Sequence, residues 1–164
     1  MINFRQFLRG AKLVAALAAA LSIAACANTN QNSQANAGAQ ATPGSQQDFV
    51  VNVGDRVFFD TDSTALSTQA RTTLDKQAQW LSHYSQYTFT IEGHADERGT
   101  REYNLALGAR RAQTVRDYLI SRGIAANRMH TISYGKERPV AVCDDISCWS
   151  QNRRAVTVLN ASSS

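Results

Sequence analysis

"GHADERGTREYNLALGARRAQTV", residues 93–115, contains three acidic residues and four arginines. It begins as a loop dense in charged residues and continues as an amphipathic helix. Its polar residues are too many and too ordered for a simple turn, and too few of them are His or Cys for a catalytic or metal-binding cluster. The mixture of acids and arginines around a helix start predicts a binding site for a molecule that carries both charges.

The segments on either side of this loop are predicted to be a strand and a helix. "YTFTIEG" at 87–93 alternates apolar residues with Thr and Glu, which is typical of a strand with one buried face. The helix is expected to run from about Arg101 to Arg122, with Gly123 as its C-terminal cap. Its inward stripe consists of Gly108, Ala112, Val115 and Leu119.

The preceding segments show the same succession of strand and helix. "RVFF" at 56–59 predicts a short strand that leads into the acidic turn "DTDS" at 60–63. A helix follows, with Ser67 or Thr68 as its N-cap. Its apolar positions are Ala70, Leu74, Ala78 and Leu81. Strand, helix and strand in succession predict that the strands at 56–59 and 87–93 form a parallel pair.

Two more strands are predicted after the second helix, "RMHTISYG" at 128–135 and "RRAVTVL" at 153–159. The order β-α-β-α-β-β indicates an α/β fold, a two-layer sandwich with a mixed sheet. Both helices are expected on one face of that sheet, because crossovers of one hand place them on the same side. We expect this single domain to occupy residues 48–160, followed by a short tail at 161–164.

Residues 1–25 have the pattern of a secretory signal peptide. Three basic residues precede the apolar run "LVAALAAALSIAA" at 13–25, which is too short to span a bilayer comfortably. The run leads through "LSIAAC" into Cys26, and this resembles a bacterial lipobox, whose Cys is lipidated and becomes the first mature residue. The alternative is an ordinary signal peptide that leaves Cys26 as a plain thiol.

Residues 26–47 are predicted to be the lipidated Cys and a flexible polar tether. After Cys26 this segment has no charged, aromatic or large aliphatic residue, so it cannot bury a core. Residues 1–25 contain three of the 17 basic residues and none of the 13 acids, so the formal net charge falls from +4 to +1 once they are removed. The folded domain therefore lacks a basic excess, and we expect no nucleic-acid partner.

Cys143 and Cys148 lie in "VCDDISCWS" at 142–150, between the last two strands. The pair is two ligands short of a structural zinc site, and the three histidines have no spacing that completes one. In an exported chain, a disulfide that closes this small loop is the favoured interpretation.

Three aspartates follow the first two strands. Asp60 and Asp62 come after the first strand and Asp96 after the second, so they are expected beyond the carboxyl edge of the sheet. Open α/β sheets form their binding crevices at this edge. The two acidic loops are therefore predicted to line one crevice.

The next helix is predicted to complete the site. Asn104 and Arg111 are seven residues apart and so lie on one face of it. Gly108 between them allows a close approach to the helix backbone, either by a ligand or by the sheet. With the carboxylate of Asp96, these residues suit a ligand that has an ammonium and a carboxylate on one carbon.

The stretch "GHADERGTREYNLALGARRAQTVRDYL", with "FFDTD" at 58–62 and "NRRAV" at 152–156, resembles the peptidoglycan-binding domain of OmpA-like proteins. The resemblance covers residues 48 to about 159 and implies non-covalent binding of the diaminopimelate of the peptidoglycan stem peptide. By motif position, it implies that the ligand-binding residues are Asp62, Asp96, Asn104 and Arg111. Family members often have Thr in place of Ala95, and the Cys143–Cys148 pair departs from the family pattern.

With the lipobox and the tether, the resemblance implies a lipid-anchored protein of the outer membrane whose domain faces the periplasm. Ala27 follows Cys26 where an inner-membrane retention signal would more often have Asp. The resemblance also implies a TolB-like periplasmic protein, and other components of the same envelope system, as partners that use an overlapping surface.

Two other functions are alternatives to wall binding. In an enzyme, Asp60, Asp62 and Asp96 would supply the acid and base for glycan or peptide cleavage. Arginines nearby lower carboxyl pKa values and disfavour a general acid, and no Ser-His or Cys-His arrangement is visible, so we expect no catalytic residue, metal or cofactor. In a periplasmic protein-interaction adaptor without wall binding, the same charged residues would form ordinary surface ion pairs.

Overall fold

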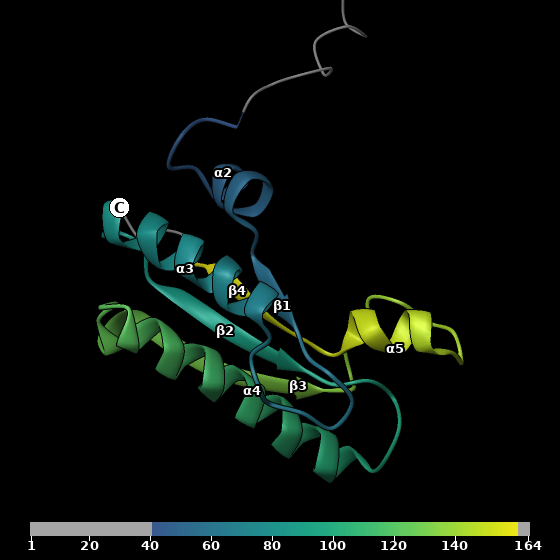
Figure 1. The fold of residues 1–164 in the computed structure, drawn as a ribbon. Helices are drawn as coiled ribbons and strands as arrows, with labels where there is room; N and C mark the ends of the chain where they lie inside the picture. Colours follow the sequence, from purple (N-terminus) through teal and green to yellow (C-terminus); the bar gives the residue numbers. More distant parts are fainter. Residues whose placement is uncertain (1–40, 161–164) are drawn as a thin grey trace, which may run out of the picture. The chain divides into compact units, whose positions relative to one another are not determined.

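The computed structural model describes residues 41–160 (Figure 1). The predicted signal peptide, the lipidation residue Cys26 and the tail at 161–164 lie outside the described residues. None of the helices within 41–160 is long and apolar enough to cross a membrane. The folded part begins before the predicted boundary at residue 48, because Ser45 caps the short helix α2 (Gln46–Asp48) by accepting a hydrogen bond from the Asp48 amide.

A four-stranded mixed sheet forms one layer, in the order β1-β4-β2-β3. β4 pairs antiparallel with both β1 and β2, while β2 and β3 are parallel. The four strands are β1 (Arg56–Phe58), β2 (Phe89–His94), β3 (Met129–Gly135) and β4 (Arg154–Leu159). The predicted α/β fold with a mixed sheet is therefore confirmed.

The predicted direct pairing of the first two strands is wrong. β4 lies between them, with Ala155 opposite Val57 of β1 and Thr157 opposite Ile91 of β2. β1 and β2 still run in the same direction, because each is antiparallel to β4. The pattern of neighbouring segments cannot reveal this insertion, since the inserted strand is the last one in the chain.

Two long helices form the second layer, α3 (Thr68–His83) and α4 (Arg101–Ser121). The Ser67 hydroxyl accepts a hydrogen bond of 3.1 Å from the Ala70 amide, so Ser67 is the N-cap of α3. Thr100 caps α4 in the same way through the Tyr103 amide. The left-handed φ of 92° at Gly123 ends α4, as the sequence predicts.

Both helices cover the same face of the sheet (Figure 1). The hydroxyl of Thr157 in β4 donates to the side-chain oxygen of Gln77 in α3, and Gly108 of α4 lies against Gly93 of β2. The apolar residues with no exposed surface are Leu74, Leu81, Phe89, Ile91, Ala112 and Leu119. The predicted apolar stripes of both helices are thus the ones that form the core.

A further helix, α5 (Ile146–Asn152), connects β3 to β4 in the segment that was predicted only as a loop with two cysteines. Asp145 caps α5 by accepting a hydrogen bond of 2.7 Å from the Ser147 amide, and a disulfide joins Cys143 to Cys148. α5 lies at the end of the sheet toward which β2 points (Figure 1). Short helical turns also occur at Phe49–Val53 and Ala126–Arg128.

The close contact between α4 and β2 requires glycine on both sides. A Cβ atom on Gly93 would overlap the carbonyl of Gly108, and a Cβ on Gly108 would lie 2.8 Å from the carbonyl oxygen of Gly93. Of the two explanations for Gly108 that the sequence allows, the structure therefore supports packing on the sheet.

Gly93→Ala should lower the free energy of unfolding by about 3 kcal/mol or more, because the new methyl group meets backbone atoms that cannot rotate away. Urea denaturation followed by circular dichroism measures this change. Gly123→Ala is the matched control, because no heavy atom lies within 4 Å of its Cβ position and only the left-handed backbone opposes it. It should cost about 1 to 2 kcal/mol. Equal losses for the two variants would contradict the close-contact explanation.

Candidate functional site

A pocket of about 300 Å³ opens where the loop after β1, the loop after β2 and the first half of α4 meet. All four predicted ligand-binding residues line it. The full lining is Thr61, Asp62, Asp96, Arg98, Gly99, Tyr103, Asn104, Leu107 and Arg111. A larger pocket of about 520 Å³ beside β1 contains none of the four, so size alone does not identify the site.

Arg111 forms the buried wall of this pocket and has no exposed surface. Its guanidinium donates three hydrogen bonds to main-chain carbonyls. Nε reaches Ser63 at 3.0 Å, Nη1 reaches His94 at 2.8 Å and Nη2 reaches Asp60 at 3.1 Å. Asp60 thus contributes its carbonyl rather than its carboxylate, and one side chain ties the loop after β1 to the end of β2.

These bonds change the role that the sequence suggests for Arg111. The guanidinium that the sequence predicts as a ligand contact has most of its N–H donors bonded to the protein's own backbone. Burial lowers the pKa of Arg111 to about 10, so the group is still charged at neutral pH. None of the ion pairs within residues 41–160 includes Arg111. A buried cation without an acidic partner favours an anion beside it.

Asp96 also lines the pocket and is only 7% exposed. Its carboxylate accepts hydrogen bonds from the Arg98 guanidinium at 2.7 Å and from the Arg153 guanidinium at 3.2 Å. Burial alone would raise the pKa of Asp96, but the bonds from Arg98 and Arg153 outweigh it and hold the pKa below its ordinary value. Asp96 is therefore ionised at neutral pH and is poorly suited to be a general acid.

Asp62 forms the exposed rim of the pocket. It has a left-handed φ of 54°, which is uncommon outside glycine and tolerated better by Asp than by most residues. The hydroxyl of Tyr103 in α4 donates to its carboxylate. No cationic side chain of the described domain pairs with Asp62, so its charge is available to a ligand.

Asn104 is buried beneath the loop that carries Asp96. Its side-chain amide donates to the carbonyl of Arg98 at 2.7 Å, which fastens the loop to the first turn of α4. Lys136, in the turn after β3, donates to the carbonyls of Glu97 and Gly99 at 3.0 and 2.7 Å. The loop at 95–100 is therefore held from two sides, and Asn104 is at least as much a support of the loop as a ligand contact.

Three contributors were missed as members of the site. They are Arg98 and Tyr103, which line the pocket, and Arg153, which contacts Asp96. Arg98 was detectable, because it lies two residues after Asp96 and such spacing brings side chains together in a tight loop. Arg153 lies in the motif "NRRAV", but its contact with Asp96 follows from the insertion of β4 beside β2, which no local pattern indicates.

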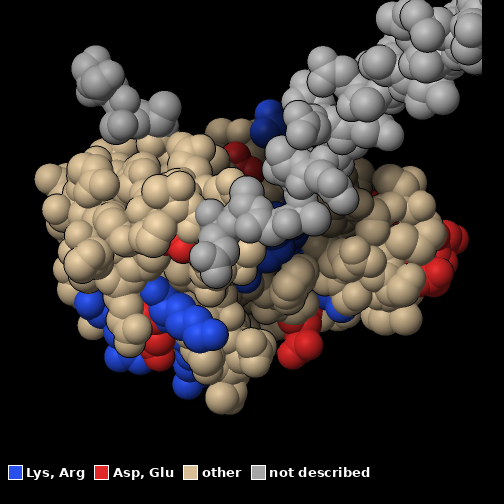
Figure 2. Space-filling model, turned by 90° about the horizontal axis from the view of Figure 1, so that it is seen from above, with Lys and Arg blue, Asp and Glu red and all other residues tan. Residues whose placement is uncertain are grey.

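The pocket thus combines a buried cation with two carboxylates, which suits a small zwitterion. Within the described domain no three His, Cys, Asp or Glu side chains converge as metal ligands. On the face of the molecule seen in Figure 2, basic and acidic side chains lie near one another and no broad area of one sign appears.

The fold agrees with the family that matches this sequence. The OmpA family model matches residues 58–155. A peptidoglycan-associated lipoprotein of Rhizobium meliloti (strain 1021) is 68% identical over 154 residues, which cover 91% of this chain and 88% of that protein. Another, from Brucella melitensis biotype 1, is 62% identical over 161 residues, covering 94% and 95%.

Solved structures agree. The crystal structure of the peptidoglycan-associated lipoprotein from Burkholderia pseudomallei is 44% identical with a TM-score of 0.63, covering 65% of this chain and 90% of that chain. The C-terminal domain of Helicobacter pylori MotB shares the fold, with a TM-score of 0.62 at 22% identity over 66% of this chain and 86% of that chain. The chain belongs to the OmpA family and, within it, to the peptidoglycan-associated lipoproteins.

Proposed function

We propose that this protein is a lipid-anchored protein of the outer membrane that binds peptidoglycan non-covalently through the diaminopimelate of the stem peptide. The observation that carries the proposal is the buried guanidinium of Arg111, which has no acidic partner in the described domain and lines a pocket that also holds Asp62 and Asp96. The free end of diaminopimelate has an ammonium and a carboxylate on one carbon, so it offers a partner to both kinds of charge.

The ligand carboxylate would lie against the N–H groups of Arg111 that the backbone leaves unused. The ammonium would lie between Asp96 and the exposed carboxylate of Asp62. Asp96 is already bonded to Arg98 and Arg153, so the ammonium would share that carboxylate with Arg98, the more exposed of the two arginines. The protein would thereby bind the ligand without covalent chemistry, and the low pKa of Asp96 supports a permanent negative charge there.

The proposed role in the cell envelope follows from the lipid at one end of the chain and the wall at the other. The protein would tether the outer membrane to peptidoglycan as part of the Tol–Pal system, which serves envelope integrity and cell division. A TolB-like periplasmic protein would be the main protein partner. The name that the relatives share supports association with peptidoglycan, and the Tol partners rest on the resemblance of the motifs.

Asp96→Asn should weaken binding to diaminopimelate by about 30-fold or more, because the amide has the shape of the carboxylate but leaves the ligand ammonium without its counter-charge. The measurement is sedimentation with insoluble peptidoglycan, competed by free diaminopimelate. Arg116→Ala is the control, because it removes a charged side chain from α4 outside the pocket. This variant should bind as wild type does.

Arg111→Lys should reduce both binding and stability. Lysine keeps the charge but cannot reach three carbonyls at once, so the free energy of unfolding should fall by about 2 to 4 kcal/mol. Wall sedimentation below the new melting temperature should also fail, since a point charge does not reproduce the planar donor. A variant with wild-type stability would contradict the three carbonyl bonds.

The adaptor without wall binding is the alternative that these experiments test. If folded Asp96→Asn and Arg111→Lys proteins both sediment with peptidoglycan as wild type does, the zwitterion site is wrong. If wild type itself does not sediment, the adaptor replaces the present proposal. Release of soluble muropeptides from isolated wall would instead indicate an enzyme.

Cys26→Ser should move the protein from the detergent-soluble membrane fraction to the soluble periplasm while leaving its circular dichroism spectrum unchanged. Stable anchoring needs more than one acyl chain, and bacterial lipoproteins carry these chains on the lipobox Cys. Without Cys26 the proposed lipid anchor is therefore lost. Cell fractionation with immunoblotting measures the shift. Full retention of the variant in the membrane would refute the lipid anchor at Cys26.

A further inference from the structure

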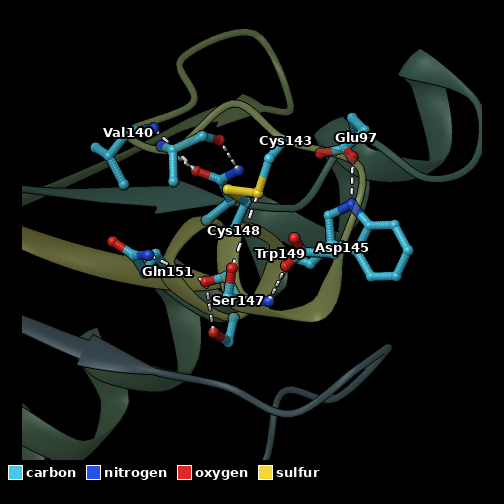
Figure 3. Close-up of a disulfide and its surroundings, with 11 residues drawn as sticks. Glu97, Val140, Cys143, Asp145, Ser147, Cys148, Trp149 and Gln151 are labelled. Atoms are coloured by element: carbon cyan, nitrogen blue, oxygen red, sulfur yellow. Dashed lines mark hydrogen bonds between the residues drawn. A yellow bond between two sulfur atoms is a disulfide. The ribbon is translucent and has the colours of Figure 1, made fainter.

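The seven-residue helix α5 is held at its first turn by covalent and polar contacts. The disulfide joins Cys143, in the preceding loop, to Cys148 in α5, and the carboxylate of Asp145 caps the helix (Figure 3). Helices this short are not stable on their own in water. The position of the residues that follow Cys148 therefore depends on these restraints.

The next residue, Trp149, contacts the loop of the candidate site. Its indole Nε1 donates to the carboxylate of Glu97, and Figure 3 shows the two side chains meeting beside the disulfide. The guanidinium carbon of Arg98 lies 4.2 Å from the centre of the Trp149 ring, which is the geometry of a cation–π contact. Glu97 and Arg98 directly follow Asp96 in the sequence. One side chain of α5 therefore contacts both of the residues that follow Asp96, the carboxylate proposed to bind the ligand ammonium.

A second connection runs from α5 to Asp96 through Arg153, which follows the helix. The Arg153 amide donates to the carbonyl of Trp149 at 3.1 Å, and its guanidinium contacts Asp96 at 3.2 Å and the carbonyl of Phe59 at 3.0 Å. A shift of α5 would therefore be felt at Asp96 by two routes, one through Trp149 and Arg98 and one through Arg153.

We propose that Trp149 is a positioning residue for the diaminopimelate site and that the Cys143–Cys148 disulfide keeps it in place. Wall binding should then depend on a disulfide that lies outside the pocket. This inference rests on the proposed function and adds two determinants to the same site.

Loss of the indole should weaken binding for two reasons that act in the same direction. The loop at 95–100 loses a restraint from the α5 side, so more conformational entropy is lost when it binds a ligand. In addition, the ligand ammonium must share the Asp96 carboxylate with the Arg98 guanidinium. The Trp149 ring is a second partner of that guanidinium, and Arg98 keeps this contact when its bond to Asp96 weakens. Without the ring, Asp96 is the main partner of Arg98, so Arg98 competes more strongly with the ligand ammonium for that carboxylate.

The test uses the full mature chain in detergent and diaminopimelate as the probe, with affinity measured by calorimetry. Trp149→Ala should bind about fivefold more weakly or worse, because it loses both the ring and the indole N–H. Trp149→Phe keeps a ring over Arg98 and should recover part of this loss. Cys143→Ser with Cys148→Ser should weaken binding about threefold or more. Gln151→Ala, an exposed change in the same helix, is the control and should bind as wild type does.

A second readout separates positioning from general stability. The chain has two tryptophans, so its nitrogen-15 spectrum contains two indole signals. The Trp149 signal, assigned with Trp149→Phe, should shift when diaminopimelate is added. The Trp80 signal should not, because that indole donates to Asp48 at 2.8 Å, away from the pocket.

The outcomes distinguish this inference from the function on which it rests. If wild type binds no diaminopimelate, the proposed function fails and this inference fails with it. If wild type binds and Trp149→Ala binds equally well, the inference alone is overturned. If Trp149→Ala is weak but the double Cys→Ser protein binds as wild type does, the role of the disulfide is overturned.

Discussion

The site depends above all on one buried guanidinium. Arg111 carries its charge into the interior and binds the carbonyls of Asp60, Ser63 and His94, which belong to the loop after β1 and the end of β2. Without that side chain, three carbonyls would lose their donors, and the loop after β1 would lose its attachment to the end of β2. The same group supplies the positive charge of the pocket, so the residue that shapes the site is also the one that gives it its attraction for anions.

The charges around the pocket are neutralised at one residue and left without a counter-charge at two others. Asp96 is neutralised by Arg98 and Arg153, which spares the fold the cost of a buried lone carboxylate. Within residues 41–160, Arg111 has backbone partners but no acidic partner, and Asp62 has a hydroxyl partner but no cationic one. A simple anion or a simple cation would satisfy only one of these two groups. A molecule with both charges on one carbon would satisfy them together, which is the physical basis of the selectivity that the proposed function requires.

Most of the fold and the membership of the site could be predicted from local sequence. The spacing of Leu74 and Leu81, and the glycine at 123 that ends α4, define helices without any knowledge of the tertiary structure. Placing Asp62 and Asp96 at one sheet edge required only the direction of two strands. The position of β4 between β1 and β2, and hence the reach of Arg153 to Asp96, required long-range pairing that no local pattern encodes. The carbonyl bonds of Arg111 were hidden for the same reason, because a side chain's type reveals its charge but not its partners.

The contact between Gly93 and Gly108 limits how this protein can move. Helices that pack on a sheet through interdigitated side chains can slide by a small amount, as each side chain changes rotamer. Where backbone rests on backbone, no rotamer is available to absorb a displacement, and α4 is fixed against β2 beside the pocket. Shear between the two layers is thus unavailable as a response to binding. Any adjustment to a ligand or a partner is therefore expected in the loops at 60–63 and 95–100, while α4 and β2 beneath them keep their relative position.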